Sequence, residues 1–431
     1  MRRTNRHGPG FIIWTLVSAA AAVSWWPAGA QAVPLFARQY DMSCVACHSA
    51  FPRLNAFGEH FRDQGMRLPN WRETTVDTGD ERLALPRIPP IAFRAQAFVQ
   101  GREGEEIDPV TGPTGNEADF DFQAPYLIKL LSSAPLSDNI TYYFYGIFAE
   151  KGGNGETVIE DAWFSHGDLF GSGVGLQLGQ FQVSDLMFPR ETRLTFQDFM
   201  VYRMAEITYD RGVLFDRGLG PVSVAVGAVN GNGIEENFDV NSPGFRRPDN
   251  MFDNDQDKSV FGRVGVELGP ATVGLFALSG EQANATGPAG TDSGDRETDK
   301  EIYGVDLRGR WGAKTYWFAQ ALWNRWDDFL APGQTLEWDG GFAGVDYILN
   351  DRWALSMLYN YADAGDLAGT GTVFEGIEIN TLTLGASYYF MRNVKGLLEL
   401  NADLQDEDDD PDFVGHETKE GYVLVGFDAA F

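Results

Sequence analysis

Hydrophobic and polar positions alternate along most of the chain after residue 90. Between residues 394 and 404, valine, leucine, alanine and glycine residues recur at every second position, and Lys395, Glu399, Asn401 and Asp403 lie between them. The stretches 259–268 and 381–390 alternate in the same way. Because successive side chains of a strand point to opposite faces, this period of two predicts strands with one apolar and one polar face.

Three features of these segments favour a membrane barrel over a soluble β-sandwich, whose strands would alternate too. The segments are about ten residues long, like tilted strands that cross a membrane. Aromatic residues crowd the segment ends, where an interfacial girdle would lie. The chain ends on Phe431, on the same face as Val423, Val425 and Phe427, and such a terminal aromatic resembles the last strand of bacterial outer-membrane barrels. The girdle is expected to include Trp311, Trp323, Trp326, Trp353 and the run 388–390.

The segments number sixteen, and they predict an all-β outer-membrane barrel of about 16 antiparallel strands over residues 91–431. Short turns alternate with long loops, as in barrels whose termini both lie in the periplasm. The long loops are expected at 230–257, 280–299, 326–340 and 405–419. The strands are expected to begin near Ile91, Tyr126, Asn139, Thr157, Gly173, Val201, Pro221, Lys258, Ala271, Lys300, Lys314, Gly341, Arg352, Glu378, Val394 and Glu420.

A barrel of this size encloses a lumen rather than a filled core. The polar faces of the strands would line that lumen. The charged residues expected there include Arg263, Asp306, Arg308, Arg310 and Lys395.

Residues 1–32 have the layout of a secretory signal peptide. Three arginines precede an uncharged apolar stretch from 11 to 26, and small residues from Ala28 onward suit a signal peptidase. We expect cleavage after Ala32, with Ala30 as the second choice. We therefore expect export and localisation in the outer membrane of a Gram-negative bacterium, in contact with outer-membrane lipid.

Acidic residues outnumber basic ones by 62 to 33, and removal of the signal peptide takes the formal net charge from −29 to −32. Nucleic acid is excluded as a partner class, because phosphate binding needs clustered Lys and Arg. The densest acidic groups are 406–410 and the set Asp253, Asp255 and Asp257. Such carboxylates suit hard cations and would concentrate Fe²⁺ near a pore mouth, although a solvated, repulsive outer surface is the simpler explanation.

The chain has two cysteines, Cys44 and Cys47, and His48 follows the second at once. This C-x-x-C-H pattern is typical of c-type haem attachment. Two thiols one turn apart can each bond a vinyl-derived carbon of the porphyrin, and the adjacent imidazole then reaches the iron as the proximal ligand. A redox disulfide would not need His48, and a zinc site would need more Cys or His than the nearby His60. The sequence therefore predicts one covalent haem c.

The distal haem ligand stays open at this point. Residues 52–64 are expected to form a short helix whose apolar face, with Leu54, Phe57 and Phe61, covers the porphyrin. Gly65 should end that helix. Met66 is the first candidate for the distal ligand, His60 the alternative and Met42 a third, and the sixth position could also be open. The haem domain and its linker, residues 33–90, are small, so we expect the barrel to supply part of the shelter for the haem.

The surroundings of the motif resemble a known family. Residues 36–39 (Phe-Ala-Arg-Gln) and 51–58 (Phe-Pro-Arg-Leu-Asn-Ala-Phe-Gly) flank it, and 184–193 and 201–203 lie further along. These stretches resemble the fused cytochrome–porins of the outer membrane, best known from iron-oxidising bacteria. The resemblance implies a monohaem domain that plugs or lines a porin of about sixteen strands, with Cys44, Cys47 and His48 holding the haem. It implies extracellular Fe(II), or another donor, and a periplasmic cytochrome or other soluble carrier as partners.

Three functions follow from these expectations. The first is an electron conduit that oxidises Fe(II) at the cell surface, with an activity like that of an iron:cytochrome c oxidoreductase. The second is a porin for small solutes whose haem segment is a redox-sensitive plug. The third is a haem peroxidase or sensor, which would need an open sixth position on the iron.

Overall fold

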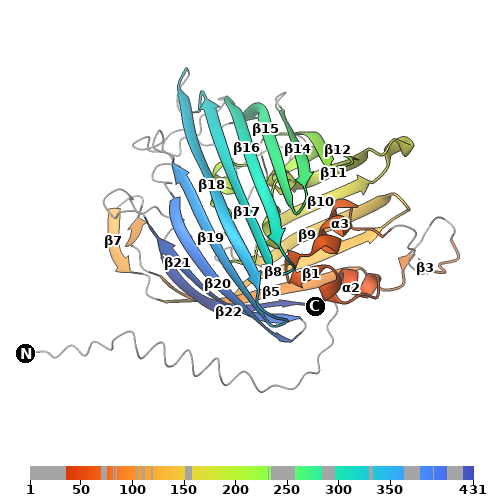
Figure 1. The fold of residues 1–431 in the computed structure, drawn as a ribbon, viewed down its shortest axis with the longest axis horizontal. Helices are drawn as coiled ribbons and strands as arrows, with labels where there is room; N and C mark the ends of the chain where they lie inside the picture. The colour runs from red at the N-terminus through yellow and green to blue at the C-terminus, as the bar shows by residue number, and fades with distance from the viewer. Residues whose placement is uncertain are drawn as a thin grey trace, which may run out of the picture.

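The computed structural model describes residues 35–68, 75–80, 82, 85–102, 105–108, 112–117, 120–150, 158–231, 233, 258–283, 297–329, 333–363, 379–391, 393–404 and 421–431. Sixteen of its strands form one closed barrel in which neighbours along the chain are antiparallel neighbours in the wall (Figure 1). The strands are β5 (Ile91–Arg102), β8 (Asp121–Pro135), β9 (Ile140–Glu150), β10 (Val158–His166), β11 (Gly175–Gln182), β12 (Tyr209–Leu219), β13 (Val222–Val229), β14 (Ser259–Leu268), β15 (Ala271–Ala283), β16 (Glu297–Trp311), β17 (Thr315–Asp327), β18 (Thr335–Ile348), β19 (Trp353–Asp363), β20 (Ile379–Met391), β21 (Val394–Asp403) and β22 (Tyr422–Ala430).

The first and last strands of the barrel pair with each other and close the wall. β22 lies antiparallel to β5, and Phe93 and Phe431 exchange backbone hydrogen bonds of 2.6 and 2.8 Å. Both ends of the barrel chain therefore lie at the same rim, which also carries the short turns. Short turns lie on the periplasmic side of such barrels, so this is the periplasmic rim.

The predicted count of sixteen strands is confirmed, but two expectations about their limits are wrong. A strand does not begin near Val201, because residues 200–204 form the helix α4 (Met200–Met204) and β12 begins only at Tyr209. No long loop covers 326–340 either, since β17 runs to Asp327 and β18 starts at Thr335.

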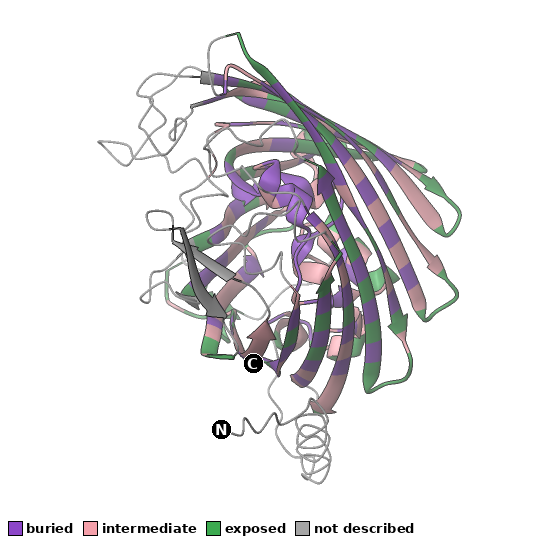
Figure 2. Ribbon diagram, turned by 90° about the vertical axis from the view of Figure 1, so that its left-hand side faces the viewer, coloured by how far each residue is buried: buried purple, intermediate pink, exposed green. Residues whose placement is uncertain are grey.

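The outer surface of the wall is apolar. Every second residue of β19 is exposed and the residues between are buried, and Figure 2 shows this banding along the neighbouring strands. Trp311, Trp323 and Trp353 are exposed on the outside, as predicted for the girdle. Trp326 contradicts that prediction, because it faces the lumen and is 1 % exposed. A closed barrel with an outward apolar face crosses the outer membrane, with lipid around it.

Charged residues on the inner face of the wall pair with one another. Arg263 donates to both carboxylate oxygens of Asp306, at 2.6 and 2.8 Å, and Lys395 lies 3.6 Å from Asp428. The predicted lumen positions of Arg263, Asp306 and Lys395 are confirmed, since each is buried inside the barrel. Arg310 also points inward, where it pairs with Glu59 of the N-terminal segment. Arg308 is half-buried and lines a cavity in the lumen.

Residues 183–208, here called the lumen segment, connect β11 to β12 across the inside of the barrel. Its Phe199 stacks on Phe342 of β18 with ring centres 4.2 Å apart, and Phe188 stacks on Phe318 of β17 at 4.4 Å. Three strands further along the wall, Glu399 of β21 accepts hydrogen bonds from the backbone N–H groups at positions 196 and 197. The segment is the buried helical stretch inside the barrel in Figure 2. It contains η4 (Val183–Leu186), η5 (Arg190–Thr192) and α4.

The N-terminal segment, residues 35–68, docks at the periplasmic end of the lumen (Figure 1). Arg53, only 4 % exposed, donates to Asp346 of β18 at 2.6 Å, and its guanidinium lies 5.0 Å from the centre of the Phe188 ring. Tyr389 of β20 donates to the carbonyl of Phe51 at 2.8 Å. The elements of the segment are α2 (Leu35–Gln39), η2 (Cys44–Ala46), β1 (His48–Ala50), β2 (Arg53–Leu54) and α3 (Ala56–Asp63).

The remaining elements are small. They are the two-stranded sheet of β3 (Thr75–Val76) and β4 (Leu85–Pro86), the hairpin of β6 (Glu105–Asp108) and β7 (Gly112–Glu117), and η3 (Leu169–Gly171). No helix among the described residues is long and apolar enough to cross a membrane. The expected signal peptide and both acidic loop groups lie outside the described residues.

Candidate haem-binding site

The C-x-x-C-H motif forms a tight turn at the start of a hairpin. Cys44 opens η2, Cys47 ends it, and His48 begins β1, which pairs with β2. Cys44 and Cys47 form no disulfide, and both are half-buried. Burial and the neighbouring Cys44 raise the pKa of the Cys47 thiol. The short turn thus brings two thiols and an imidazole to one place, as thioether attachment of a porphyrin requires.

The His48 imidazole is held so that one ring nitrogen stays available. Its Nδ1 lies 3.1 Å from the carbonyl oxygen of Pro52. A carbonyl can only accept, so Nδ1 carries the proton and Nε2 keeps its lone pair. Burial lowers the pKa of His48 to about 4, so the ring is neutral at physiological pH. This is the state and the outer hydrogen bond that metal-binding histidines commonly have.

Asn55 and Gly58 fix the motif against α3. The Asn55 side chain accepts from the N–H of Gly58 at 3.0 Å as the N-cap of the helix, and it donates to the carbonyl of Ala46 at 2.9 Å. A Cβ atom on Gly58 would lie 2.1 Å from the carbonyl oxygen of Cys47. The run from Phe51 to Gly58 therefore packs the helix directly on the cysteine turn.

Replacement of Gly58 by alanine should displace the motif, because the added Cβ would clash with the carbonyl oxygen of Cys47, and a backbone atom cannot move aside as a flexible side chain can. Overpacking of this kind costs about 1–3 kcal/mol, and we expect the ratio of covalent haem to protein to fall at least several-fold. The ratio can be measured from the pyridine haemochrome spectrum of purified protein. Gly421→Ala is the matched control, because a Cβ at Gly421 would make only ordinary contacts, the nearest at 3.6 Å. Equal haem content in both variants would contradict this view of the turn.

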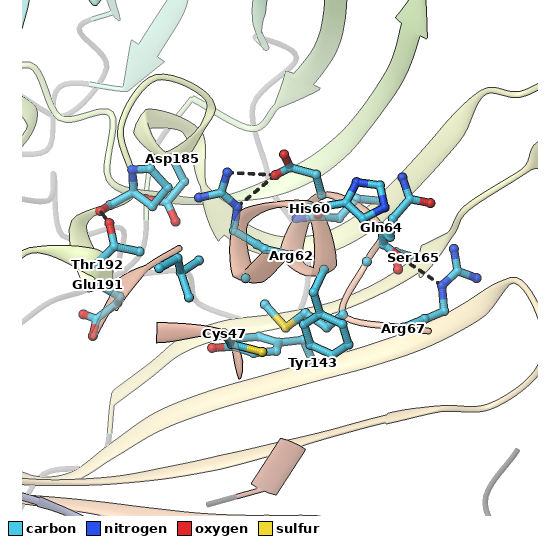
Figure 3. Close-up of a pocket in the computed structure, with 18 of the residues that line it drawn as sticks. Cys47, His60, Arg62, Gln64, Arg67, Tyr143, Ser165, Asp185, Glu191 and Thr192 are labelled. Atoms are coloured by element: carbon cyan, nitrogen blue, oxygen red, sulfur yellow. Dashed lines mark hydrogen bonds and ion pairs between the residues drawn. The ribbon is translucent and has the colours of Figure 1, made fainter. Parts of the chain in front are cut away.

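One cavity of about 1000 Å³ unites the predicted site residues. Its walls come from the N-terminal segment, from the lumen segment and from strands of the barrel, chiefly β9 to β13. Figure 3 shows Asp185 and Glu191 on one side of α3, and Gln64, Ser165 and Arg67 on the other. The cavity is large enough for a cofactor, and most of its wall belongs to the barrel. The six predicted site residues that line it are Met42, Cys44, Cys47, His48, His60 and Met66.

The helix after the motif departs in part from its prediction. It starts at Ala56 rather than at Pro52, because β1 and β2 occupy the preceding residues. Leu54 and Phe61 line the cavity, but Phe57 is 40 % exposed on the other side of α3, and its predicted place over the porphyrin is wrong. Gly65 ends the helix as predicted, with φ +68°.

Met66 and His60 differ in their surroundings. The N–H of Met66 bonds back to the carbonyl of Phe61 at 2.9 Å, and Tyr40 donates to the carbonyl of Met66 at 3.1 Å. Met66 is half-buried and packs against the core of the lumen segment, whereas His60 is exposed on α3. The structure thus gives Met66 the more fixed and more apolar place of the two.

Sequence reasoning missed the charged residues around the cavity. Glu191 of the lumen segment pairs with Arg94 and Lys129 of the barrel wall, each at 3.1 Å. Asp185 and Asp161 also line the cavity. Residues 184–193 are noted only for their resemblance to cytochrome–porins. The alternation of apolar and polar residues in the strands does not indicate that a connection between two strands folds back into the lumen.

The donor set fits a c-type haem. Two thiols that form no disulfide, a neutral imidazole with its proton on Nδ1 and a large cavity meet at the same turn. Among the described residues, no group of three or more His, Cys, Asp and Glu side chains is placed to hold a metal ion directly.

Comparisons with known proteins bear on the barrel. No family model matches the sequence, and no curated protein matches it. Among solved structures, the outer membrane channel DcaP of Acinetobacter baumannii has a TM-score of 0.54 at 13 % identity, over 79 % of this chain and 96 % of its own. OmpF of Salmonella typhi, solved with daunomycin, has a TM-score of 0.54 at 12 % identity, over 79 % and 97 %.

An anion-selective porin from Comamonas acidovorans has a TM-score of 0.51 at 13 % identity, over 79 % of this chain and 98 % of its own. At this level of identity the likeness concerns the fold. The predicted fold of the barrel is therefore confirmed: the chain has a closed 16-strand barrel of the kind seen in outer-membrane porins.

Proposed function

We propose that the protein carries one covalent c-type haem and transfers electrons across the outer membrane. The observation that carries the proposal is the meeting of Cys44, Cys47 and the free Nε2 of His48 at one cavity inside the barrel. A haem bound there supplies a one-electron Fe(III)/Fe(II) couple. The resemblance of the motif region to cytochrome–porins agrees with this and suggests Fe(II) as the donor.

The chain's own residues would each have a defined task. Cys44 and Cys47 would hold the porphyrin, and His48 would bind the iron while the carbonyl of Pro52 orients its ring. Arg53 and Asp346 keep the N-terminal segment seated against the barrel. The barrel wall and the lumen segment would cover part of the porphyrin, which the small N-terminal segment could not do alone.

The position of the cavity suggests where the electron acceptor and the electron donor would approach the protein. It lies toward the periplasmic rim, where a soluble cytochrome or another carrier can approach the N-terminal segment. The lumen segment lies between the cavity and the outer loops, and its stacked rings fill that space. An extracellular donor would therefore deliver electrons through packed protein rather than meet the cavity by diffusion.

The experiment that tests this function places donor and acceptor on opposite sides of a membrane. Haem-loaded protein is reconstituted in liposomes that contain a soluble c-type cytochrome, and Fe(II) is added outside under anoxic conditions. We expect the trapped cytochrome to be reduced at a rate proportional to the amount of inserted protein. Reduction no faster than in liposomes with haem-free protein would contradict the proposal.

A redox-plugged porin is the second candidate, and the likeness of the barrel to channels favours it. In that case solutes would pass through the lumen, and their flux would depend on the oxidation state of the plug. Liposome swelling in small sugars, measured with reduced and with oxidised protein, separates the two functions. An electron conduit needs no solute flux in either state.

We expect Met66 to be the distal ligand. A thioether ligand raises the potential of a haem relative to a second histidine, so Met66→His should lower the midpoint potential by more than about 0.1 V. Spectroelectrochemistry of the purified variant measures the shift, and His60→Ala serves as the control, with no change expected. A changed ligand spectrum in His60→Ala together with an unchanged one in Met66→Leu would assign the position to His60.

A further inference from the structure

The carboxylates of Asp185 and Asp161 line the cavity and have fewer cations bonded to them than the neighbouring Glu191 has. Asp185 belongs to η4 of the lumen segment and Asp161 to β10, and both are half-buried cavity-lining residues. The Asp185 carboxylate accepts a hydrogen bond from the N–H of Arg190 in its own segment, at 3.3 Å. The two groups thus lie next to a large apolar cofactor cavity, where a negative charge is poorly solvated.

The cations nearby are already committed to other acids. Arg62 of α3 extends toward the side of the cavity where Asp185 lies (Figure 3), but it donates to Asp63 through two nitrogens, at 2.7 and 3.0 Å. Arg190 binds Asp198. Lys129 bonds both Glu160 and Glu191, at 2.8 and 3.1 Å. Glu191 is therefore paired with two cations. The charges of Arg62 and Arg190 act on Asp185, and that of Lys129 acts on Asp161, but each of these cations binds another acid. The titratable and charged groups that face Asp185 are Arg62 from α3, Asp161 from β10, Tyr143 from β9, Tyr202 from α4, and Arg190 and Glu191 from its own segment.

We propose that Asp185 is a proton-binding site coupled to the redox state of the cavity. The carboxylate of Asp185 would take up one proton from periplasmic water when a haem bound in the cavity receives one electron from the donor, here Fe(II). It would release that proton to water when the electron passes to the acceptor. Charge in the cavity is thereby nearly conserved, which is favourable because charges interact strongly in a poorly solvated space. This inference rests on the proposed haem function.

The titration range of Asp185 suits such a role. Burial raises the pKa of Asp185 to about 7, against the lowering effects of the Arg190 N–H and of the Arg62 charge. An added electron raises the pKa further, because it disfavours a second negative charge. The reduced protein therefore binds more protons than the oxidised protein near neutral pH. By linkage, the midpoint potential falls as pH rises through this range.

The test is the midpoint potential of the haem-loaded wild type, measured by spectroelectrochemistry over about two pH units on either side of neutrality. One proton per electron converts each tenfold change in proton concentration to about 59 mV. We expect a slope that approaches this value near pH 7 in the wild type and at most a third of it in Asp185→Asn. Asp185→Glu should keep the slope. Asp351→Asn, which changes an exposed carboxylate on the turn after β18, should match the wild type.

A second variant separates this role from a structural one. Asp161→Asn removes the like charge beside Asp185, so it should keep the slope but move it to lower pH. A flat potential in the wild type, or an equal slope in Asp185→Asn, overturns the proposal while the haem function stands. A wild-type protein without a c-haem spectrum overturns both.

Discussion

Replacement of both cysteines by serine should abolish covalent haem. In Cys44→Ser/Cys47→Ser no thiol remains in the chain, so we expect the haem content to fall from one per chain to none. The barrel should still assemble, since the hydrogen bonds between its strands do not involve the motif. Haem staining after denaturing electrophoresis measures the first effect, and the faster gel migration of unheated, folded barrel measures the second.

The control for this experiment lies between the two cysteines. Val45 is 75 % exposed, and Val45→Ser should leave haem content and spectrum unchanged. His48→Ala should behave differently from both, with covalent attachment reduced and the proximal ligand lost. Full haem staining of the double cysteine variant would remove the proposed attachment site altogether.

Asp198→Asn should loosen the lumen segment and let ions through the barrel. The Asp198 carboxylate binds Arg190, Arg193 and Arg203, with Arg203 Nε at 2.9 Å. Burial alone would raise the pKa of Asp198, but the three arginines hold it well below its usual range. Loss of the carboxylate takes away the anion that the three guanidinium groups share, and breaking such a buried pair costs about 3–5 kcal/mol. We expect the conductance in planar bilayers to rise several-fold over a nearly closed wild type.

The pH dependence of the closed state follows from the same pKa. A carboxylate with a depressed folded-state pKa stabilises the fold above its unfolded pKa of about 3.9, and that stability is lost only as pH falls through the lower folded value. The wild type should therefore stay closed at pH 4. The control is Asp327→Asn, which breaks an exposed ion pair with Arg325 of 3.1 Å and should change conductance little. Equal conductance of Asp198→Asn and wild type would show that other contacts hold the segment.

Much of the barrel can be predicted from sequence, because the side chains of a strand point alternately to lipid and to the lumen, so that apolar and polar residues alternate along it. This holds for Lys395 and Arg263, whose inward direction follows from the pattern. It fails for Trp326, because an aromatic residue suits both the lipid belt and a packed lumen. Trp326 lies inward beside Lys300, whose Nζ is 4.9 Å from its ring centre. The pattern alone does not reveal that the lumen is filled.

The largest difference between the prediction and the structure lies in the lumen segment. Residues around Val201 are apolar like a strand, yet they form α4 and pack on Phe342 and its neighbours. Apolar residues on the inner faces of β14 to β19 have the same cause, since they contact this segment rather than lipid. The motif turn was predictable because its chemistry is local. Arg53 with Asp346 was not, because 293 residues separate the pair.

The central claim is that this barrel carries one haem on Cys44 and Cys47. The most direct measurement is the intact mass of the mature chain purified from outer membranes, followed by sequencing of the peptide that contains residues 44–48. We predict the mass of the polypeptide plus one haem, with both thioether bonds on that peptide and a reduced c-type spectrum after addition of dithionite. A mass equal to the polypeptide alone, with both thiols free or joined as a disulfide, would contradict the claim.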